Sequence, residues 1–171
     1  MGRDTMKFGL FLAAVAALGC TAMAATPYER ALTACRADAM KAFTKGVDNP
    51  TGYKCNWATL VKGAPGAALT GKFAAQDKLN AGTLTIIEGG DGPALVGIQT
   101  TAGKTGRQCT VAASGGRGDD DILNVKATDA GCNIRIKSSG PNVVSVTSTN
   151  CQSQCGLGAT FDGTYRLSRG T

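Results

Sequence analysis

Apolar or small residues alternate with polar ones along most of the chain after residue 68. The clearest example lies near the end, where Phe161, Gly163 and Tyr165 alternate with Asp162 and Thr164. A period of two residues places every second side chain on the same face of a sheet, so one face is buried and the other is wet. Strands are predicted at residues 69–75, 83–87, 94–100, 107–112, 123–127, 132–137, 143–147 and 159–167.

Turn signals separate the predicted strands at regular intervals. Residues 89–93 read Gly-Gly-Asp-Gly-Pro and residues 140–142 read Gly-Pro-Asn, and both sequences interrupt a strand. The helical pattern that a parallel sheet would need between its strands is missing from this region. The chain is therefore predicted to be mainly β, with a small antiparallel β-barrel or sandwich of seven to eight strands.

A different period marks residues 27–45, where one N-terminal helix is expected. Thr26 and Glu29 form a capping box around Pro27, a residue that suits the first helical position. Apolar residues then recur at steps of three and four, namely Tyr28, Leu32, Cys35, Ala39 and Phe43. Gly46 ends the predicted helix, and residues 46–50 form a break. We expect this helix to plug or cover one end of the barrel.

The N-terminal segment has the pattern of a secretory signal peptide. Arg3 and Lys7 precede an apolar stretch at residues 8–18, and small residues at Ala22 and Ala24 follow. Cleavage is predicted between Ala24 and Ala25, so the protein is expected to be periplasmic or secreted. A membrane anchor and a lipoprotein with a lipidated Cys20 are the alternatives. The expected parts are therefore the signal peptide (1–24), the helix and linker (25–50) and a disulfide-linked barrel (51–171).

Six cysteines remain after the predicted cleavage, and an even number in an exported chain indicates three disulfides. Zinc is an alternative, although an oxidising compartment disfavours it. Several pairings are compatible with the sequence. Proximity along the chain favours Cys35–Cys55, Cys109–Cys132 and Cys151–Cys155.

Composition limits the chemistry that the chain can perform. The sequence contains no His, which excludes Ser-His-Asp and Cys-His catalysis as well as His-ligated metal sites. Most carboxylates lie at predicted turns, where Asp is favoured for backbone reasons. The run Asp119-Asp120-Asp121 offers oxygen ligands for calcium, but it lacks the spacing of an EF-hand loop, and a solvated hairpin tip is favoured. We expect a non-enzymatic protein with no catalytic residues, cofactor or metal.

Positive charge is in excess, with a formal net charge of +6. Under the predicted strand phase, a basic strip projects from the outer face of the sheet and consists of Lys126, Arg135, Lys137 and Arg166. Such a strip suits anionic polymers of the cell envelope, with peripheral membrane contact at most. Nucleic acid is disfavoured, because the strip has none of the stacking aromatics of single-strand binders.

Two short motifs carry a family resemblance. Cys151 and Cys155 precede the last strand, which contains Gly163 and Tyr165, and Tyr53-Lys54-Cys55 adds a Tyr-x-Cys motif. Here the chain resembles small periplasmic lysozyme-inhibitor-like β-barrel proteins of Gram-negative bacteria. The Tyr-x-Cys motif of C-type lysozyme inhibitors continues with a glycine where this chain has Ala58.

The resemblance implies an inhibitor or immunity protein that blocks a peptidoglycan hydrolase or a lysozyme-like toxin. The predicted insertion element is the loop from residue 114 to 121, with Ser114, Arg117, Asp119, Asp120 and Asp121. A basic protein is poorly steered toward basic animal lysozymes, which favours the immunity role. Two alternatives stay open: a structural or ligand-binding barrel that docks on anionic envelope polymers, and a small-molecule barrel, which would need a lined cavity.

Overall fold

The computed structural model describes residues 24–45, 50–66, 68–75, 80–127, 131–156 and 158–168. The predicted signal peptide up to residue 23, with Cys20, lies outside the described residues, as do Gly46 and most of the predicted break. The helices are α1 (Pro27–Lys45), α2 (Trp57–Gly63) and the 3-10 helix η1 (Gln152–Gln154). The strands are β1 (Gly71–Ala75), β2 (Asn80–Ile87), β3 (Ala94–Ala102), β4 (Gln108–Arg117), β5 (Leu123–Ala127), β6 (Asn133–Gly140), β7 (Val143–Thr149) and β8 (Gly163–Leu167).

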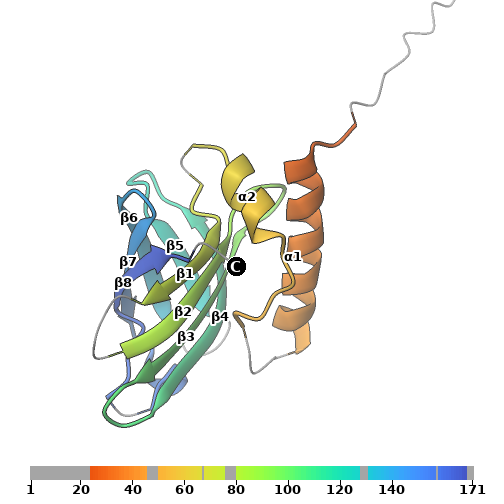
Figure 1. Ribbon diagram of the computed structural model, residues 1–171. Helices are drawn as coiled ribbons and strands as arrows, with labels where there is room; N and C mark the ends of the chain where they lie inside the picture. The colour runs from red at the N-terminus through yellow and green to blue at the C-terminus, as the bar shows by residue number, and fades with distance from the viewer. Residues whose placement is uncertain are drawn as a thin grey trace, which may run out of the picture.

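The eight strands form a closed barrel in chain order (Figure 1). Each strand pairs antiparallel with the next, and β8 pairs antiparallel with β1. The prediction of a mainly β antiparallel fold with seven to eight strands is confirmed, and the structure is the barrel rather than the sandwich. None of the helices in the described part of the chain is long and apolar enough to cross a membrane.

The barrel interior is filled by the inward-facing residues of all eight strands, as the alternation predicted. On β5 and β6, for example, Val125 lies opposite Ile134, and both are fully buried. The largest buried interior side chains are Tyr165, Phe161, Leu84, Ile86, Ile98, Leu123, Ile134 and Ile136.

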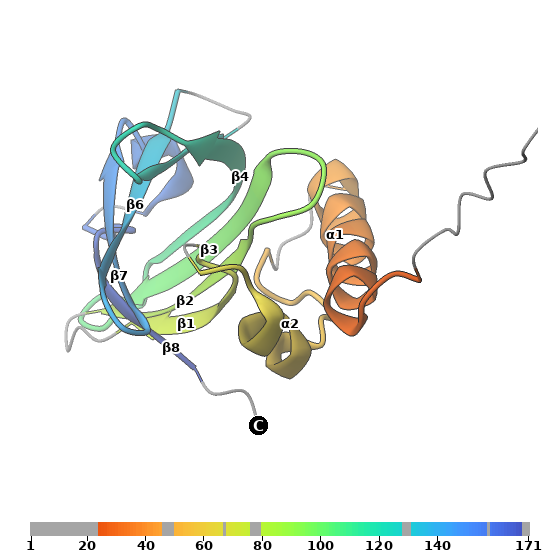
Figure 2. The ribbon, with the colours of Figure 1, turned by 90° about the horizontal axis from the view of Figure 1, so that it is seen from above.

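A second apolar cluster lies outside the barrel, between α1 and the wall formed by β2 and β3. Leu32, Cys35 and Ala39 of α1 pack with Ile87 of β2 and Leu95 of β3, all of them buried. Figures 1 and 2 both show α1 and α2 beside the barrel wall rather than across an end. The expectation that the helix covers one end is therefore wrong, because this part of the wall has apolar residues on its outer face as well.

The two helices begin as local hydrogen bonding dictates. In the predicted capping box of α1, the Thr26 amide donates to Glu29 Oε2 at 2.6 Å, and the Glu29 amide donates to Thr26 Oγ1 at 3.1 Å. Hydrogen bonds from the Thr26 amide and, to a lesser degree, from the Thr26 side chain lower the pKa of the Glu29 carboxyl. Helix α2 was not predicted, and its N-cap is Asn56, whose side chain accepts from the Thr59 amide at 3.2 Å.

Three disulfides join the six cysteines after Cys20. Cys35–Cys55 is confirmed and ties α1 to the segment before α2. The other two predicted pairs are wrong: Cys109 is bonded to Cys155 and Cys132 to Cys151, instead of Cys109–Cys132 and Cys151–Cys155. The β7–β8 loop reaches across the end of the barrel to β4, where Cys155 forms an isolated β-bridge with Cys109, so residues 46 apart in sequence meet. Three disulfides indicate an oxidising environment, such as the periplasm or the extracellular space.

The described residues of the β7–β8 loop, 150–156 and 158–162, close one end of the barrel. Disulfides tie it to Cys109 on β4 and to Cys132 beside β6. The Phe161 ring is fully buried in the interior, and the Phe161 carbonyl accepts from the Tyr165 hydroxyl at 2.7 Å. The Thr100 hydroxyl also donates to the Thr160 carbonyl at 2.8 Å. This end is therefore a fixed lid.

Burial predicts an unusual alkaline titration. Desolvation raises the pKa of Tyr53, Tyr165 and Tyr28 above the ordinary value of 10.0, with the charge of Glu88 adding to the shift of Tyr28 and that of Asp162 to Tyr165. The fold favours the neutral phenols, so their contribution to stability is present below the unfolded pKa and is lost as pH rises above it. We expect tyrosinate absorbance to rise together with unfolding, and well above pH 10.0. Independent ionisation of all three phenols near the pH found for the denatured chain would contradict this.

Candidate functional site

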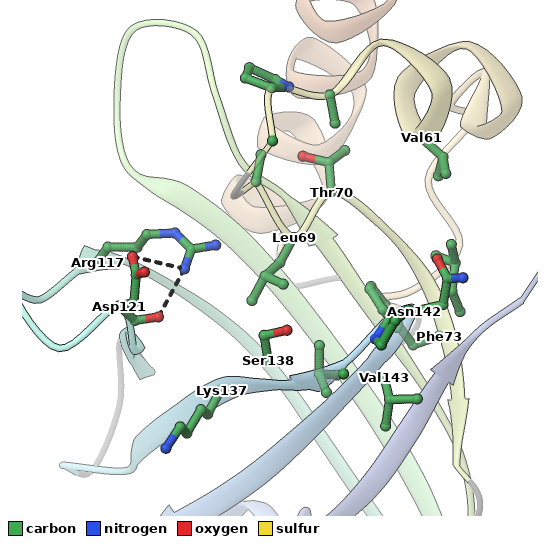
Figure 3. Close-up of a pocket in the computed structure, with 18 of the residues that line it drawn as sticks. Val61, Leu69, Thr70, Phe73, Arg117, Asp121, Lys137, Ser138, Asn142 and Val143 are labelled. Carbon is green, nitrogen blue, oxygen red and sulfur yellow. Dashed lines mark hydrogen bonds and ion pairs between the residues drawn. The ribbon is translucent and has the colours of Figure 1, made fainter.

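The opposite end of the barrel is open and forms a pocket. It lies where β1, β5 and β7 begin and where β2, β4, β6 and β8 end. The pocket has a volume of about 590 Å³ (Figure 3). Its lining comes from α2, the linker to β1, the hairpin tip at residues 118–122 and the turn at residues 140–142. One end of the barrel is thus closed by disulfide-linked chain, and the other offers a cavity.

The pocket has an apolar side and a charged side. Val61, Phe73 and Val143 lie on one side in Figure 3, whereas Arg117, Asp121 and Lys137 lie on the other. Leu69 projects between the two groups. Val144 and Leu167 also line the pocket, and Val144 is fully buried, as Phe73 nearly is, so the floor is built from the top of the barrel core. Small-molecule sites usually combine an apolar floor with polar groups that orient the ligand, and here seven polar or charged side chains share the lining with the apolar ones.

Glu88 and Arg117 form a two-pronged ion pair at this end of the barrel. Arg117 Nε lies 2.6 Å from Glu88 Oε1, and Arg117 Nη2 donates to Glu88 Oε2 at 2.9 Å. Arg117 is opposite Leu123 in the β4–β5 register, on the inward-facing side of the strand. About a fifth or less of each side chain is exposed (20% and 16%), so water screens this pair less than it screens a surface pair. Bidentate geometry makes the pair a directional clamp between β4 and the end of β2.

The same clamp holds the linker that forms one wall of the pocket. Glu88 Oε2 accepts a hydrogen bond from the Leu69 amide at 2.8 Å. The Thr70 hydroxyl donates to the Glu88 carbonyl at 2.8 Å and accepts from the Glu88 amide at 3.0 Å. Glu88 is therefore an exception to the expectation that most carboxylates lie solvated at turns. The sequence did contain a signal for this burial. Every second residue of β2 faces the barrel interior, and Glu88 follows Leu84 and Ile86 in that series.

The predicted insertion loop is shorter than expected. Ser114 and Arg117 belong to β4, and Ser114 lies opposite Leu95 on the outer face. The loop itself is a tight hairpin tip, where the Gly118 amide donates to the Ile122 carbonyl at 3.0 Å. The expectation of a loop from residue 114 to 121 is therefore wrong for residues 114–117, which belong to β4 and are paired with neighbouring strands.

The three aspartates of the hairpin tip are exposed at the rim of the pocket. Asp120 forms an ion pair with Arg135 at 3.3 Å, and the Asp121 carboxylate, 84% exposed, lies 3.7 Å from Arg117. The Asp121 carbonyl accepts from Arg117 Nη1 at 2.8 Å, which ties the tip to the clamp. Within the described ranges, no group of three or more His, Cys, Asp or Glu side chains is arranged to hold a metal ion.

The predicted basic strip is on the outer surface, as expected. Lys126, Arg135, Lys137 and Arg166 are all exposed, on β5, β6 and β8. The structure also brings one member of the strip, Lys137, to the rim of the pocket beside the hairpin tip. The predicted strip and the predicted acidic tip therefore meet at the open end.

A second pocket of about 420 Å³ lies beside the closing loop. It is lined mainly by polar side chains, among them Ser148 and Asp162, together with the disulfide-bonded Cys151 and Cys155. Asp162 Oδ1 accepts from both the amide and the hydroxyl of Ser148 at 2.6 Å. These bonds hold the loop in place, and this pocket has no apolar floor comparable to that of the open end.

The clamp predicts a specific energetic coupling. In a double-mutant cycle with alanine at Glu88 and Arg117, we expect a coupling energy of about 1.5–2 kcal/mol, because both groups are largely buried and charge-assisted hydrogen bonds join them. The matched cycle with Asp121 and Arg117 should give less than about 0.5 kcal/mol, because Asp121 is exposed. Urea unfolding of the single and double variants measures both values. Equal couplings in the two cycles would rule out a clamp at Glu88.

Fold and pocket together define a closed eight-stranded antiparallel β-barrel with a disulfide-held lid at one end and a lined cavity at the other. Comparisons of the chain with protein-family models, with curated proteins and with solved structures found no match. The resemblance to lysozyme inhibitors therefore stays a prediction. Function has to be inferred from the geometry of the barrel.

Proposed function

We propose that this chain is a non-enzymatic binding protein of an oxidising compartment, and that the open end of the barrel is its binding site. The observation that carries the proposal is the contrast between the two ends. One end is closed by a loop tied down with two disulfides, and the other has a pocket of about 590 Å³ with an apolar floor and a polar rim.

The pocket favours a small molecule with an apolar body and a polar group. Its volume lies within the range of roughly 300–1,000 Å³ that small-molecule sites span. Val61, Phe73 and Val143 would contact the apolar body, and the polar part would face Lys137 and the hairpin tip. Strand pairing and the Glu88–Arg117 clamp already hold the walls, so little conformational entropy is lost on binding.

The role of the charged groups supports binding rather than catalysis. Three nitrogens of Arg117 are engaged, two with Glu88 and one with the Asp121 carbonyl. Glu88 in turn accepts from the Leu69 amide as well as from Arg117. These side chains serve to position the rim, and their hydrogen bonds point to the protein itself rather than into the cavity.

The proposal is tested by blocking the pocket from its edge. Val61 lines the apolar side and is 37% exposed, so Val61→Trp adds bulk there without disturbing the core. Met40 on α1, 46% exposed, lies outside the pocket lining, which makes Met40→Trp a matched control. We expect the apolar fluorophore N-phenyl-1-naphthylamine to bind the folded protein saturably. Val61→Trp should weaken that binding at least about tenfold, or about 1.4 kcal/mol.

The control variant should bind the fluorophore as the unaltered protein does. Equal loss in both tryptophan variants, or saturable binding that Val61→Trp leaves unchanged, would place the binding site elsewhere. Thermal unfolding of both variants verifies that neither change has disturbed the fold.

A second candidate function is the inhibitor or immunity role against a peptidoglycan hydrolase. The observation that favours it is the exposed hairpin tip Asp119–Asp121, which rigid strands present at the barrel rim. The net charge of +6 works against long-range attraction to a basic enzyme, so the partner would need an acidic or neutral surface around a local basic contact.

Charge reversal tests this second candidate. If the tip contacts a hydrolase, Asp119→Lys should abolish inhibition of cell-wall lysis in a panel of hydrolases, whereas Asp91→Lys in the β2–β3 loop should not. Both residues are exposed, so neither change should affect folding. Inhibition that survives Asp119→Lys, or no inhibition by the unaltered protein, would remove this candidate and leave ligand binding untouched.

A further inference from the structure

We propose that the outer surface of β5–β8 is a docking surface for an acidic polysaccharide. We call this surface the basic face and define it by Lys126, Arg135, Lys137 and Arg166. It is separate from the pocket except at Lys137, so the proposal goes beyond ligand binding and can hold or fail independently.

Strand register places these cations in one connected arrangement. Arg135 and Lys137 are two residues apart on β6, which puts them on the same side at a spacing of about 7 Å. Lys126 lies opposite Asn133, and is therefore a diagonal neighbour of Arg135 across the β5–β6 pair. Arg166 lies beyond β7, opposite Val143 on the adjacent strand. A chain molecule lying across these strands can meet several cations in succession.

Apart from Ala74 and Val143, which lie opposite Arg166, the strand neighbours of the cations are hydrogen-bonding side chains. Arg135 is flanked by Asn124 and Thr147, and Lys137 by Ser145, which in turn lies opposite Thr164 on β8. Amide and hydroxyl groups beside cations suit the hydroxyl-rich, charged surface of an acidic sugar chain.

Asp162 and the exposed carboxylates of the hairpin tip, Asp119–Asp121, border the basic face. Asp120 pairs with Arg135 at 3.3 Å, with about half of each side chain exposed (53% and 56%). Asp162 accepts from the amide and hydroxyl of Ser148. Exposed ion pairs of this kind are weak, so Arg135 can exchange its partner for a ligand anion at little cost.

Other anionic partners fit the basic face less well. Membrane docking uses apolar side chains that enter the lipid, but the exposed large apolar residues in the described part of the chain are Met40 and Val61, both on helices. Single-stranded nucleic acid is bound through stacking aromatics, and the four cations are interleaved with Asn, Ser and Thr instead. An acidic polysaccharide needs only the repeated charges and hydrogen bonds that this face provides.

Binding to polygalacturonate, with neutral dextran as the reference polymer, tests the proposal. We expect the oxidised protein to bind polygalacturonate at about 50 mM salt and to lose most of that binding by about 200 mM, as exposed charge contacts do. The triple variant Lys126→Thr, Lys137→Thr and Arg166→Thr should bind at least about fivefold more weakly. For this variant, the slope of log affinity against log salt concentration should also be smaller in magnitude by about 2.

Matched controls separate the basic face from net charge alone. Lys41→Gln, Lys62→Gln and Lys104→Gln together remove the same charge from exposed positions on α1, α2 and the β3–β4 loop, and should leave binding within about twofold. The charge-conserving triple Lys126→Arg, Lys137→Arg and Arg166→Lys should keep full binding. It guards against loss through misfolding of the threonine variant.

Three outcomes would overturn the proposal. One is equal weakening by the two charge-removing triples. Another is tighter binding to vesicles of phosphatidylglycerol, or to single-stranded DNA, than to polygalacturonate. The last is polygalacturonate binding that is no stronger than dextran binding. Fluorophore binding in the pocket should be unchanged by Arg166→Thr, so failure here leaves the proposed function standing.

Discussion

Replacing both Cys109 and Cys155 with alanine is expected to lower the free energy of unfolding by about 4 kcal/mol. The bond joins residues 46 apart in sequence, and crosslinks that close long loops restrict the unfolded chain most. Removal of this bond also releases the closing loop from β4, so the lid at this end of the barrel should loosen. Urea unfolding of the oxidised proteins measures the change, and the melting temperature should fall by roughly 10–15 °C.

The matched variant removes Cys35–Cys55, which spans 20 residues and lies outside the barrel. It should cost about 3 kcal/mol and leave the lid in place. The connectivity of the other two disulfides has a separate test, because trypsin cuts after Arg107, Arg117, Lys126, Arg135, Lys137 and Arg166. These cuts place Cys109 and Cys132 in separate peptides and leave Cys151 and Cys155 together in a third. Without reduction, peptides 108–117 and 127–135 should both remain attached to peptide 138–166. A 108–117 peptide joined to 127–135 alone would show the sequence-proximal pairing instead.

Gly97→Ala is expected to destabilise the protein by about 3 kcal/mol, mainly by lifting the α-helical layer from the barrel wall. A Cβ atom at Gly97 of β3 would lie 1.8 Å from the Pro50 carbonyl oxygen and 3.0 Å from the Tyr53 hydroxyl. The first contact is with backbone, so the segment before α2 has to move away, and the cost is that of an overpacked core. Chemical unfolding gives the free-energy change, and hydrogen exchange of the α1 amides reports the loosened layer.

Gly116→Ala on β4 is the control for this prediction. A Cβ atom there meets nothing within 4 Å, so the substitution should change stability by less than about 0.5 kcal/mol. If the two alanine variants were equally stable, the close seating of residues 50–53 on β3 would be disproved.

Much of the barrel could be predicted from local patterns. Alternation located seven to eight strands and their buried faces, because in an antiparallel barrel the interior side chains repeat every second residue. The capping box at Thr26 and Glu29 located the start of α1, and its apolar stripe located the buried face. Cys35–Cys55 was predicted because the two cysteines are neighbours along the chain.

The position of α1 was missed because a break in the alternation was not interpreted. Consecutive apolar residues occur at Ile86-Ile87 and at Leu95-Val96, and in each pair one side chain faces the core while the other faces outward. Such pairs indicate a wall with two buried faces, which is where a helix packs. Cys109–Cys155 could not be predicted, since it depends on the path of the β7–β8 loop across the end of the barrel. Cys132–Cys151 joins the two ends of the β6–β7 hairpin, so the turn at residues 140–142 did carry a signal for it that was not used.

The candidate site was predicted only in pieces. Asp121 and Lys137 had been singled out for different roles, and the structure places both at the rim of one pocket. The role of Glu88, which accepts a hydrogen bond from the linker wall, was missed because a carboxylate at a Gly-rich turn is usually solvated. The pocket itself arises where strand ends and the linker from α2 meet, and no local pattern encodes that convergence.

The binding site at the open end is tested most directly by an NMR titration of the isotope-labelled, oxidised protein with N-phenyl-1-naphthylamine. If the pocket takes an amphiphilic ligand, backbone amide shifts should change at the rim and linker, at Thr70, Ser138 and Asn142. The amides of the closing loop, such as Gln152 and Thr160, should stay where they are. Shift changes confined to the closing loop, or spread evenly over the protein, would contradict a ligand site between α2 and the β6–β7 turn.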